Sequence, residues 1–159
     1  ITDIMHKKYL YYGLDETYNY LEPGTDAATS AVLVSSYDRG EPVVAYYWEP
    51  TWLLGKYDFV LLEDEPYDQA LFLEGKTQCP PVRVTVCVSN AFYESDPEFC
   101  EFLSHYHTSS ALTSEALAYI EETGADYKEA AVWFLKEHRE MVEGWLTAQQ
   151  AETLYAAIG

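Results

Sequence analysis

Hydrophobic and polar positions along the first half of the chain alternate between helical and strand-like patterns. Apolar residues at helical spacing predict a helix over residues 3–12, with Gly13 as its stop. A second helix is predicted over residues 26–37, capped by Thr25 and ended by Gly40. Short runs rich in β-branched and aromatic residues predict strands over residues 18–21, 42–48, 58–62 and 82–88. This alternation is typical of an α/β sheet with crossover helices.

The second half of the chain has a helical pattern after its one predicted strand. Residues 63–81 form a polar connection before that strand. Ser95 and Glu98 have the spacing of a capping box, and Thr147 is predicted to cap the last helix. Further helices are predicted over residues 114–122, 127–136 and 140–146. Because one strand cannot make a sheet alone, this half is expected to need a partner sheet.

Length and composition limit the classes of protein to which the chain belongs. Its 159 residues suffice for one ordinary domain, and a hydrophobic content of 48% excludes a disordered chain. The 9 Lys and Arg against 27 Asp and Glu give 9 − 27 = −18. This charge excludes nucleic acid and anionic membrane surfaces as natural partners, and it is compatible with a cationic ligand. The longest apolar runs are far too short to insert across a bilayer.

Candidate catalytic and metal-binding groups are sparse. The sequence has no nucleophile with a nearby base, no glycine-rich phosphate loop and no cofactor motif. Cys79, Cys87 and Cys100 fit no metal spacing. We expect three buried or half-buried thiols, and one disulfide plus a free thiol is the alternative. His105 and His107 fall on different faces of a helix, which makes shared metal ligation awkward. The sequence therefore predicts no enzyme, metal or cofactor site.

Two further polar features are interpreted as surface. The acidic turn Glu63-Asp64-Glu65 is predicted to be solvated, with a general-acid or metal site as the alternative. His138 lies near the end of a predicted helix, where a surface imidazole interacts favourably with the helix dipole.

The segment Tyr46-Tyr47-Trp48-Glu49-Pro50-Thr51-Trp52 carries the densest chemical signal. It lies where a predicted buried strand ends, and ligands of α/β sheets bind outside such carboxyl ends. A quaternary ammonium donates no strong hydrogen bond, so its recognition requires aromatic faces that attract it by cation–π forces. Composition leaves a second interpretation equally open, in which the rings pack a core. Strand alternation places Tyr46 and Trp48 on one side and Tyr47 on the other.

The sequence around this segment resembles a known family. Residues 40–62, within GEPVVAYYWEPTWLLGKYDFVLLEDEP, are similar to the second-lobe segment of substrate-binding proteins of ABC importers for glycine betaine, choline and proline betaine. Residues 22–28 look like the loop and helix start that precede it in the family. Residues 84–92 look like the return strand, and residues 126–146 like the closing helices. The resemblance covers nearly the whole chain.

The resemblance implies an α/β fold of the type II periplasmic-binding-protein kind, of which the chain holds a part. Residues 1–80 are expected to form the second-lobe segment that carries the aromatic motif. Residues 81–159 are expected to form a hinge strand and C-terminal helices that return to the first lobe. Because the chain starts at Ile1 within a predicted helix, we expect a segment of a longer protein, with weak or no ligand binding on its own.

The resemblance also implies which residues contact a ligand. Trp48 matches the family's cage tryptophan and is the first candidate. The other candidates from the same motif are Tyr47, Glu49, Pro50, Thr51 and Trp52. Thr51 stands where several betaine binders carry His or Tyr, and Glu49 either adds negative potential or faces solvent. Trp133 and Trp145 belong to the family's terminal helices and are interpreted as packing residues.

The function implied by the resemblance is that of a solute-binding component of an ABC importer, without catalysis. A quaternary amine is enclosed between aromatic faces, the lobes close, and the protein docks on the ABC permease subunits. The location implied is extracytoplasmic, either periplasmic or lipid-anchored at the cell surface. The alternatives are a substrate-binding domain fused to a permease, a sensor domain, and a small α/β hydrolase that uses the acidic turn near Glu63.

Overall fold

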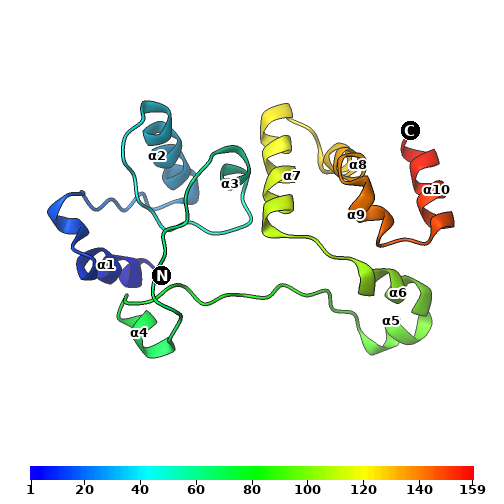
Figure 1. Ribbon diagram of the computed structural model, residues 1–159, viewed down its shortest axis with the longest axis horizontal. Helices are drawn as coiled ribbons and strands as arrows, with labels where there is room; N and C mark the ends of the chain where they lie inside the picture. Colours follow the sequence, from blue (N-terminus) through cyan, green and yellow to red (C-terminus); the bar gives the residue numbers. More distant parts are fainter. The chain divides into compact units, whose positions relative to one another are not determined.

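The computed structural model describes all residues from 1 to 159, and the chain divides into two compact units (Figure 1). Unit 1 comprises Ile1–Tyr47 and Phe59–Arg83, and unit 2 comprises Trp48–Asp58 and Val84–Gly159. The regular structure of both units is helical. Unit 1 contains α1 (Thr2–Tyr11), the short 3-10 helix η1 (Leu14–Glu16), α2 (Asp26–Arg39) and α4 (Gln69–Leu73). Unit 2 contains α3 (Trp52–Lys56), α5 (Asn90–Ser95), α6 (Pro97–His105), α7 (Ser110–Thr123), α8 (Tyr127–Glu137), α9 (Arg139–Glu143) and α10 (Ala148–Ile158).

The predicted start and end of helix α2 are confirmed. The Thr25 side chain accepts a hydrogen bond from the Ala28 amide at 3.2 Å, which satisfies one of the free amides of the first turn. Gly40 ends the helix in the left-handed conformation, with φ of 65°, which glycine adopts without a Cβ penalty. Leu33 is buried on this helix together with Ser30 and Ser36.

In unit 1, helix α1 is held to the chain around Thr77 by polar contacts. The Lys8 ammonium donates a hydrogen bond to the Thr77 carbonyl at 2.7 Å and also contacts the Asp64 carboxylate. The Tyr12 hydroxyl donates to the same carboxylate. Gly75 permits the close approach, because a Cβ at this position would lie 2.5 Å from the Lys8 backbone nitrogen.

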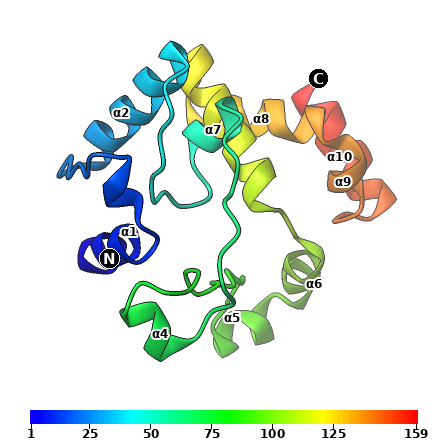
Figure 2. The same ribbon diagram turned by 60° about the vertical axis from the view of Figure 1, so that its left-hand side comes forward.

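In unit 2, the short helix α3 packs against α7 (Figure 2). Leu53 is completely buried in this contact region. Gly55 brings the two backbones together, because a Cβ there would lie 2.1 Å from the Ser114 carbonyl oxygen. No side chain fits between the backbones at that distance, so the contact requires glycine.

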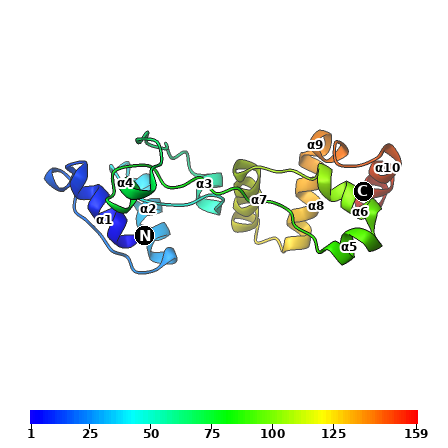
Figure 3. The ribbon, with the colours of Figure 1, turned by 90° about the horizontal axis from the view of Figure 1, so that it is seen from below.

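The remaining helices of unit 2 bury small and apolar side chains. Figure 3 shows α8, α9 and α10 in the C-terminal part of this unit. Trp145 is 6% exposed, and its ring lies 4.8 Å from that of Tyr106 at the end of α6. Trp133 stacks on Tyr119 of α7 with a centroid distance of 4.2 Å. Both tryptophans therefore pack against other rings, as predicted. The other buried apolar residues here are Cys100, Ala118, Ala130, Val142 and Ala151.

The prediction of strands is wrong for this structure, and the α/β fold class is not confirmed. Residues 18–21, 42–48, 58–62 and 82–88 form no β-sheet pairing. A β-branched run becomes a strand only when a neighbour supplies hydrogen bonds and a surface to pack on. These runs lack such a neighbour, because no backbone ladder reaches them and most of their side chains are exposed. The exposed fractions are 91% for Val84, 93% for Leu61 and 81% for Val60.

Two details of the helical prediction also need correction. The polar connection over residues 63–81 contains helix α4, whose start is fixed by the Asp68 side chain accepting from the amides at its first turn. The predicted Ser95 cap is wrong, because Ser95 belongs to α5 and its hydroxyl donates to the Phe92 carbonyl. Asp96 caps α6 instead, one residue later. Thr147 caps the last helix as predicted, in a capping box with Gln150.

Candidate functional site

The turn that follows Trp48 is fixed to unit 2 by its backbone. The Thr51 amide donates a hydrogen bond to the Ser114 hydroxyl at 3.0 Å, and both residues are buried. The Thr51 side chain accepts from the Leu54 amide at 3.4 Å and so caps α3. With its hydroxyl used in this cap, Thr51 acts on the turn's conformation rather than as an exposed polar group.

Two tryptophans flank this fixed turn. Trp48 is 45% exposed, which is high for a ring of this size. Trp52 is half-buried, and its ring lies 6.4 Å from that of Tyr57 in an edge-to-face arrangement. Glu49 and Pro50 between them are exposed, and the Glu49–Pro50 peptide bond is cis. The structure thus brings five of the predicted site residues into one short turn of unit 2.

The sixth predicted residue, Tyr47, lies in unit 1 and points its hydroxyl toward α2. Its hydroxyl lies 2.7 Å from the Ser30 hydroxyl and donates to the Asp26 carboxylate at 2.9 Å. Burial raises the pKa of Tyr47, the Ser30 contact lowers it, and the Asp26 carboxylate raises it further, so that the phenol is held in its neutral form. Tyr46 is 39% exposed, so exposure follows the alternation expected for Tyr46, Tyr47 and Trp48.

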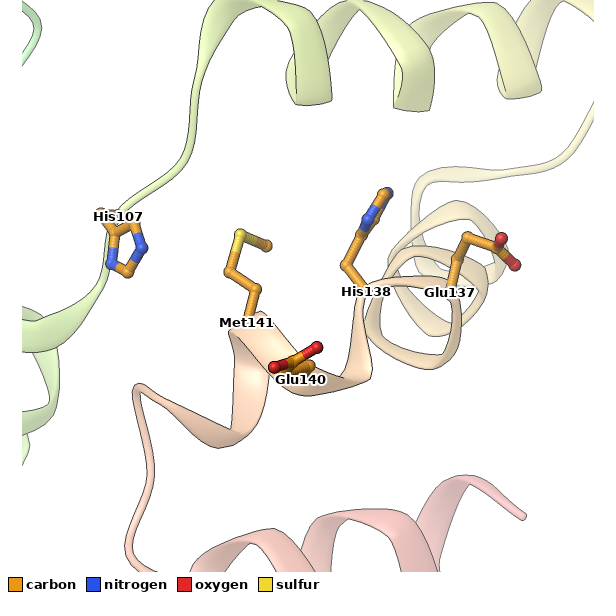
Figure 4. A pocket seen from close by; sticks show the side chains of 5 residues that line it. All are labelled: His107, Glu137, His138, Glu140 and Met141. Atoms are coloured by element: carbon orange, nitrogen blue, oxygen red, sulfur yellow. The ribbon is translucent and has the colours of Figure 1, made fainter.

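Two hollows in unit 2 lie away from the aromatic turn. One, of about 460 Å³, is lined by His107 from the chain after α6 and by residues of the α8–α9 region (Figure 4). The other, of about 800 Å³, lies at the α7–α8 turn and is lined by Tyr119, Lys128, Glu129, Val132, Trp133 and Lys136, among others. Neither lining includes a residue of the aromatic motif. Sequence reasoning missed the second hollow, although the spacing of Lys128, Val132 and Lys136 was a readable signal.

The acidic turn is partly built into unit 1 and is not simply solvated. Burial acts to raise the pKa of Asp64, but hydrogen bonds from Lys8, Tyr12 and the Glu65 amide offset it and hold the pKa below its usual value. The hydrogen bond to Asp64, together with burial, raises the pKa of Tyr12 to about 12. Glu63 and Glu65 are exposed. Asp64 is therefore a structural carboxylate that joins α1 to the acidic turn.

His138 and the cysteines differ in part from expectation. His138 lies at the end of α8 as predicted, but its side chain is only 19% exposed. Its Nε2 atom lies 3.0 Å from a Glu115 carboxylate oxygen, so it faces a side chain of α7 rather than solvent. The three cysteines are free thiols, with Cys100 buried, Cys79 half-buried and Cys87 exposed. The expectation of a buried or half-buried thiol is wrong for Cys87, because its segment has no sheet to cover it.

Three further observations bear on the class of protein. No group of three or more His, Cys, Asp or Glu side chains is arranged to hold a metal ion. None of the helices has the length and apolar character needed to cross a membrane. The model of a protein family, described as the substrate binding domain of ABC-type glycine betaine transport system, matches residues 1–137.

Proposed function

Because the chain belongs to the family of substrate-binding domains of ABC-type glycine betaine transport systems, we propose that it captures a quaternary ammonium compound on the aromatic turn around Trp48. The family is one of periplasmic-binding-protein-like domains that serve transport and are not enzymes. It implies a small-molecule ligand and ABC permease subunits as partners. The proposal adds the chemistry of recognition and the residues that perform it.

The physical basis of the proposal is the attraction of an onium group to aromatic faces. The positive charge of a trimethylammonium group is spread over methyl groups that donate no strong hydrogen bond. Each ring contact contributes about 0.5–2 kcal/mol, with the larger values in desolvated sites. The half-exposed ring of Trp48 is the observation that carries the proposal, because it presents a large aromatic surface at a motif that the family match covers.

The fixed turn supports this role by limiting the motion of the tryptophans. The buried hydrogen bond from the Thr51 amide and the complete burial of Leu53 anchor the chain directly after Trp48. A ring attached to an ordered backbone loses less conformational entropy on binding, and this improves affinity. Trp52, in the first turn of α3, is proposed as the second ring contact.

The other motif residues are proposed in supporting roles. Pro50 and Thr51 shape the turn, and the exposed carboxylate of Glu49 adds negative potential near a cation. Tyr47 is the least direct of the candidates, because its hydroxyl is already bonded to Asp26 and Ser30. Further rings of the cage are proposed to come from a first lobe. The protein is proposed to act outside the cytoplasm, where family members work, and to close its lobes before docking on the permease.

The experiment that tests the proposal is calorimetric titration of the full-length protein with glycine betaine, choline, carnitine and proline betaine. Trp48→Ala is expected to weaken binding of the preferred ligand by roughly thirtyfold or more, because a desolvated ring contact is lost. Trp48→Phe keeps an aromatic face and is expected to retain most of the affinity. Tyr127→Ala is the matched control, because Tyr127 is 84% exposed and lies outside the motif. Unchanged affinity in Trp48→Ala would remove Trp48 from the site.

A further inference from the structure

The hollow of about 800 Å³ at the α7–α8 turn is an open groove lined by residues of both helices. Two of its lining residues, Tyr119 of α7 and Trp133 of α8, stack directly on each other, with an interplanar angle of 6°. The two helices are joined by a short turn at Gly124, which takes the left-handed conformation with φ of 70°. Ala118 and Ala130 are buried on the same two helices. These contacts hold the two lining helices against each other.

The α8 wall of the groove carries an ordered pattern of charge. Lys128, Val132 and Lys136 follow one another at intervals of four residues, so they lie on one face of the helix. The backbone positions of the two lysines are separated by about two helical turns, roughly 12 Å along the axis. Val132 lies between them and is half-buried, which gives the face an apolar centre with a cation on each side.

These two lysines lie on one face of a helix in a chain with a formal charge of −18. Like Lys7 and Arg83, they form no ion pair, whereas the other five basic residues each pair with a carboxylate. The Lys136 ammonium lies near Gly159, directly after α10, and the Lys136 side chain is exposed. Glu129 is the one acidic side chain of the lining, and its carboxylate accepts a hydrogen bond from the Asp126 amide. The groove therefore carries two cations against one carboxylate, 2 − 1 = +1, within an acidic protein.

We propose that this groove is a docking site for an acidic amphipathic helix of a partner protein. Two carboxylates spaced by about two turns would face Lys128 and Lys136, and an apolar side chain between them would cover Val132 and the edge of Trp133. This is the helix-in-groove mode of recognition, in which an apolar stripe supplies contact area and flanking charges set register and orientation. The inference does not depend on the ligand captured at Trp48, since none of the motif residues lines the groove.

The test uses fluorescence anisotropy with a labelled synthetic peptide that has paired glutamates two helical turns apart and leucine between them. A peptide of the same composition in scrambled order is the comparison. The ordered peptide is expected to bind more tightly, with an affinity that falls as salt is raised. Lys128→Gln and Lys136→Gln are each expected to weaken binding about twofold to fivefold. Arg83→Gln is the matched control, because it removes the same charge from a residue that is outside the groove.

Three results would overturn the proposal. The first is equal binding of the ordered and scrambled peptides, and the second is an equal loss in Arg83→Gln and Lys128→Gln. The third is concentration-dependent dimerisation in sedimentation experiments that Lys128→Gln abolishes, because the occupant would then be a second copy of this acidic chain. Val132→Asp is expected to abolish peptide binding, while the circular dichroism spectrum and the quaternary-amine affinity stay unchanged.

Discussion

The two units of this protein hold their helices in place with different kinds of interaction. In unit 1, the Lys8 ammonium of α1 and the Tyr12 phenol directly after it both contact the Asp64 carboxylate. In unit 2, apolar burial dominates, from Leu53 at α3 to Val142 at α9. Leu33 is the one apolar side chain of unit 1 that is buried, whereas unit 2 buries several. The stability of unit 1 is therefore expected to fall most when a charged group is removed, and that of unit 2 when buried side-chain volume is removed.

Both units also contain a glycine at their closest backbone contact. Gly75 in unit 1 and Gly55 in unit 2 each stand where a Cβ would overlap a neighbouring backbone. The difference lies in what surrounds the contact. Gly55 lies two residues from a fully buried leucine, whereas Gly75 lies beside the Lys8 backbone and close to a polar cluster. Close packing is thus common to both units, and the chemistry that stabilises it is not.

The largest expected effect on stability is in unit 2. Leu53→Ala is expected to lower the free energy of unfolding by about 2–5 kcal/mol, because it removes a fully buried side chain and leaves a cavity. Urea unfolding followed by tryptophan fluorescence measures the change. Leu61→Ala removes the same atoms from a side chain that is 93% exposed, and a loss of stability below about 0.5 kcal/mol is expected there. Similar losses in both variants would contradict the contrast between the units.

The next largest effect is expected in unit 1. Asp64→Asn is expected to cost about 1–3 kcal/mol, because it leaves the part-buried Lys8 ammonium without its charged partner. Hydrogen exchange of the α1 amides reports the loss directly. Glu63→Gln is the control, since Glu63 is the exposed neighbour of the same turn. If the two substitutions cost the same, the polar cluster is not what joins α1 to this segment.

The pH dependence of that contribution has a defined sign. The folded state lowers the pKa of Asp64 below its usual value of 3.8, so the unfolded state binds the proton more readily. The stabilisation is fully present above this value and is lost as the pH falls below it through the folded-state pKa. Unfolding of the wild type is therefore expected to become easier below about pH 4, and Asp64→Asn is expected to flatten this part of the profile.

How much of this could be predicted from the sequence differs between helices and strands. The start of α2 at Thr25 and the cap of α10 at Thr147 depend on contacts three residues away, so local spacing predicted both. The strands did not follow from local pattern, because pairing depends on a neighbour that the run itself does not contain. The Ser95 cap failed by one residue, because the Asp96 carboxylate, directly before Pro97, accepts from the Phe99 amide and caps α6 instead.

The candidate site shows the same limit. Its residue types were readable from the motif, and so was the alternation that separates Tyr47 from Trp48. The anchoring of Thr51 by Ser114 was not readable, because the two residues are 63 positions apart. The Asp64 contacts with Lys8 and Tyr12 span more than 50 positions and were missed for the same reason. Long-range polar contacts between ordinary residue types leave no local signature.

The smallest expected effect concerns Tyr47, whose hydroxyl joins the end of the aromatic run to α2. Tyr47→Phe removes the contacts with Asp26 and Ser30 and is expected to destabilise unit 1 by about 0.5–1.5 kcal/mol, the net worth of an ordinary hydrogen bond. Tyr46→Phe is the matched control. The same variant separates packing from ligand contact, because it keeps the ring and removes only the hydroxyl. A lower free energy of unfolding with unchanged quaternary-amine affinity in the full-length protein would show that the hydroxyl of Tyr47 stabilises the fold. A loss of affinity without a loss of stability would assign the hydroxyl to ligand binding. The contacts of Tyr47 with α2 would then not belong to the polar contacts that stabilise unit 1.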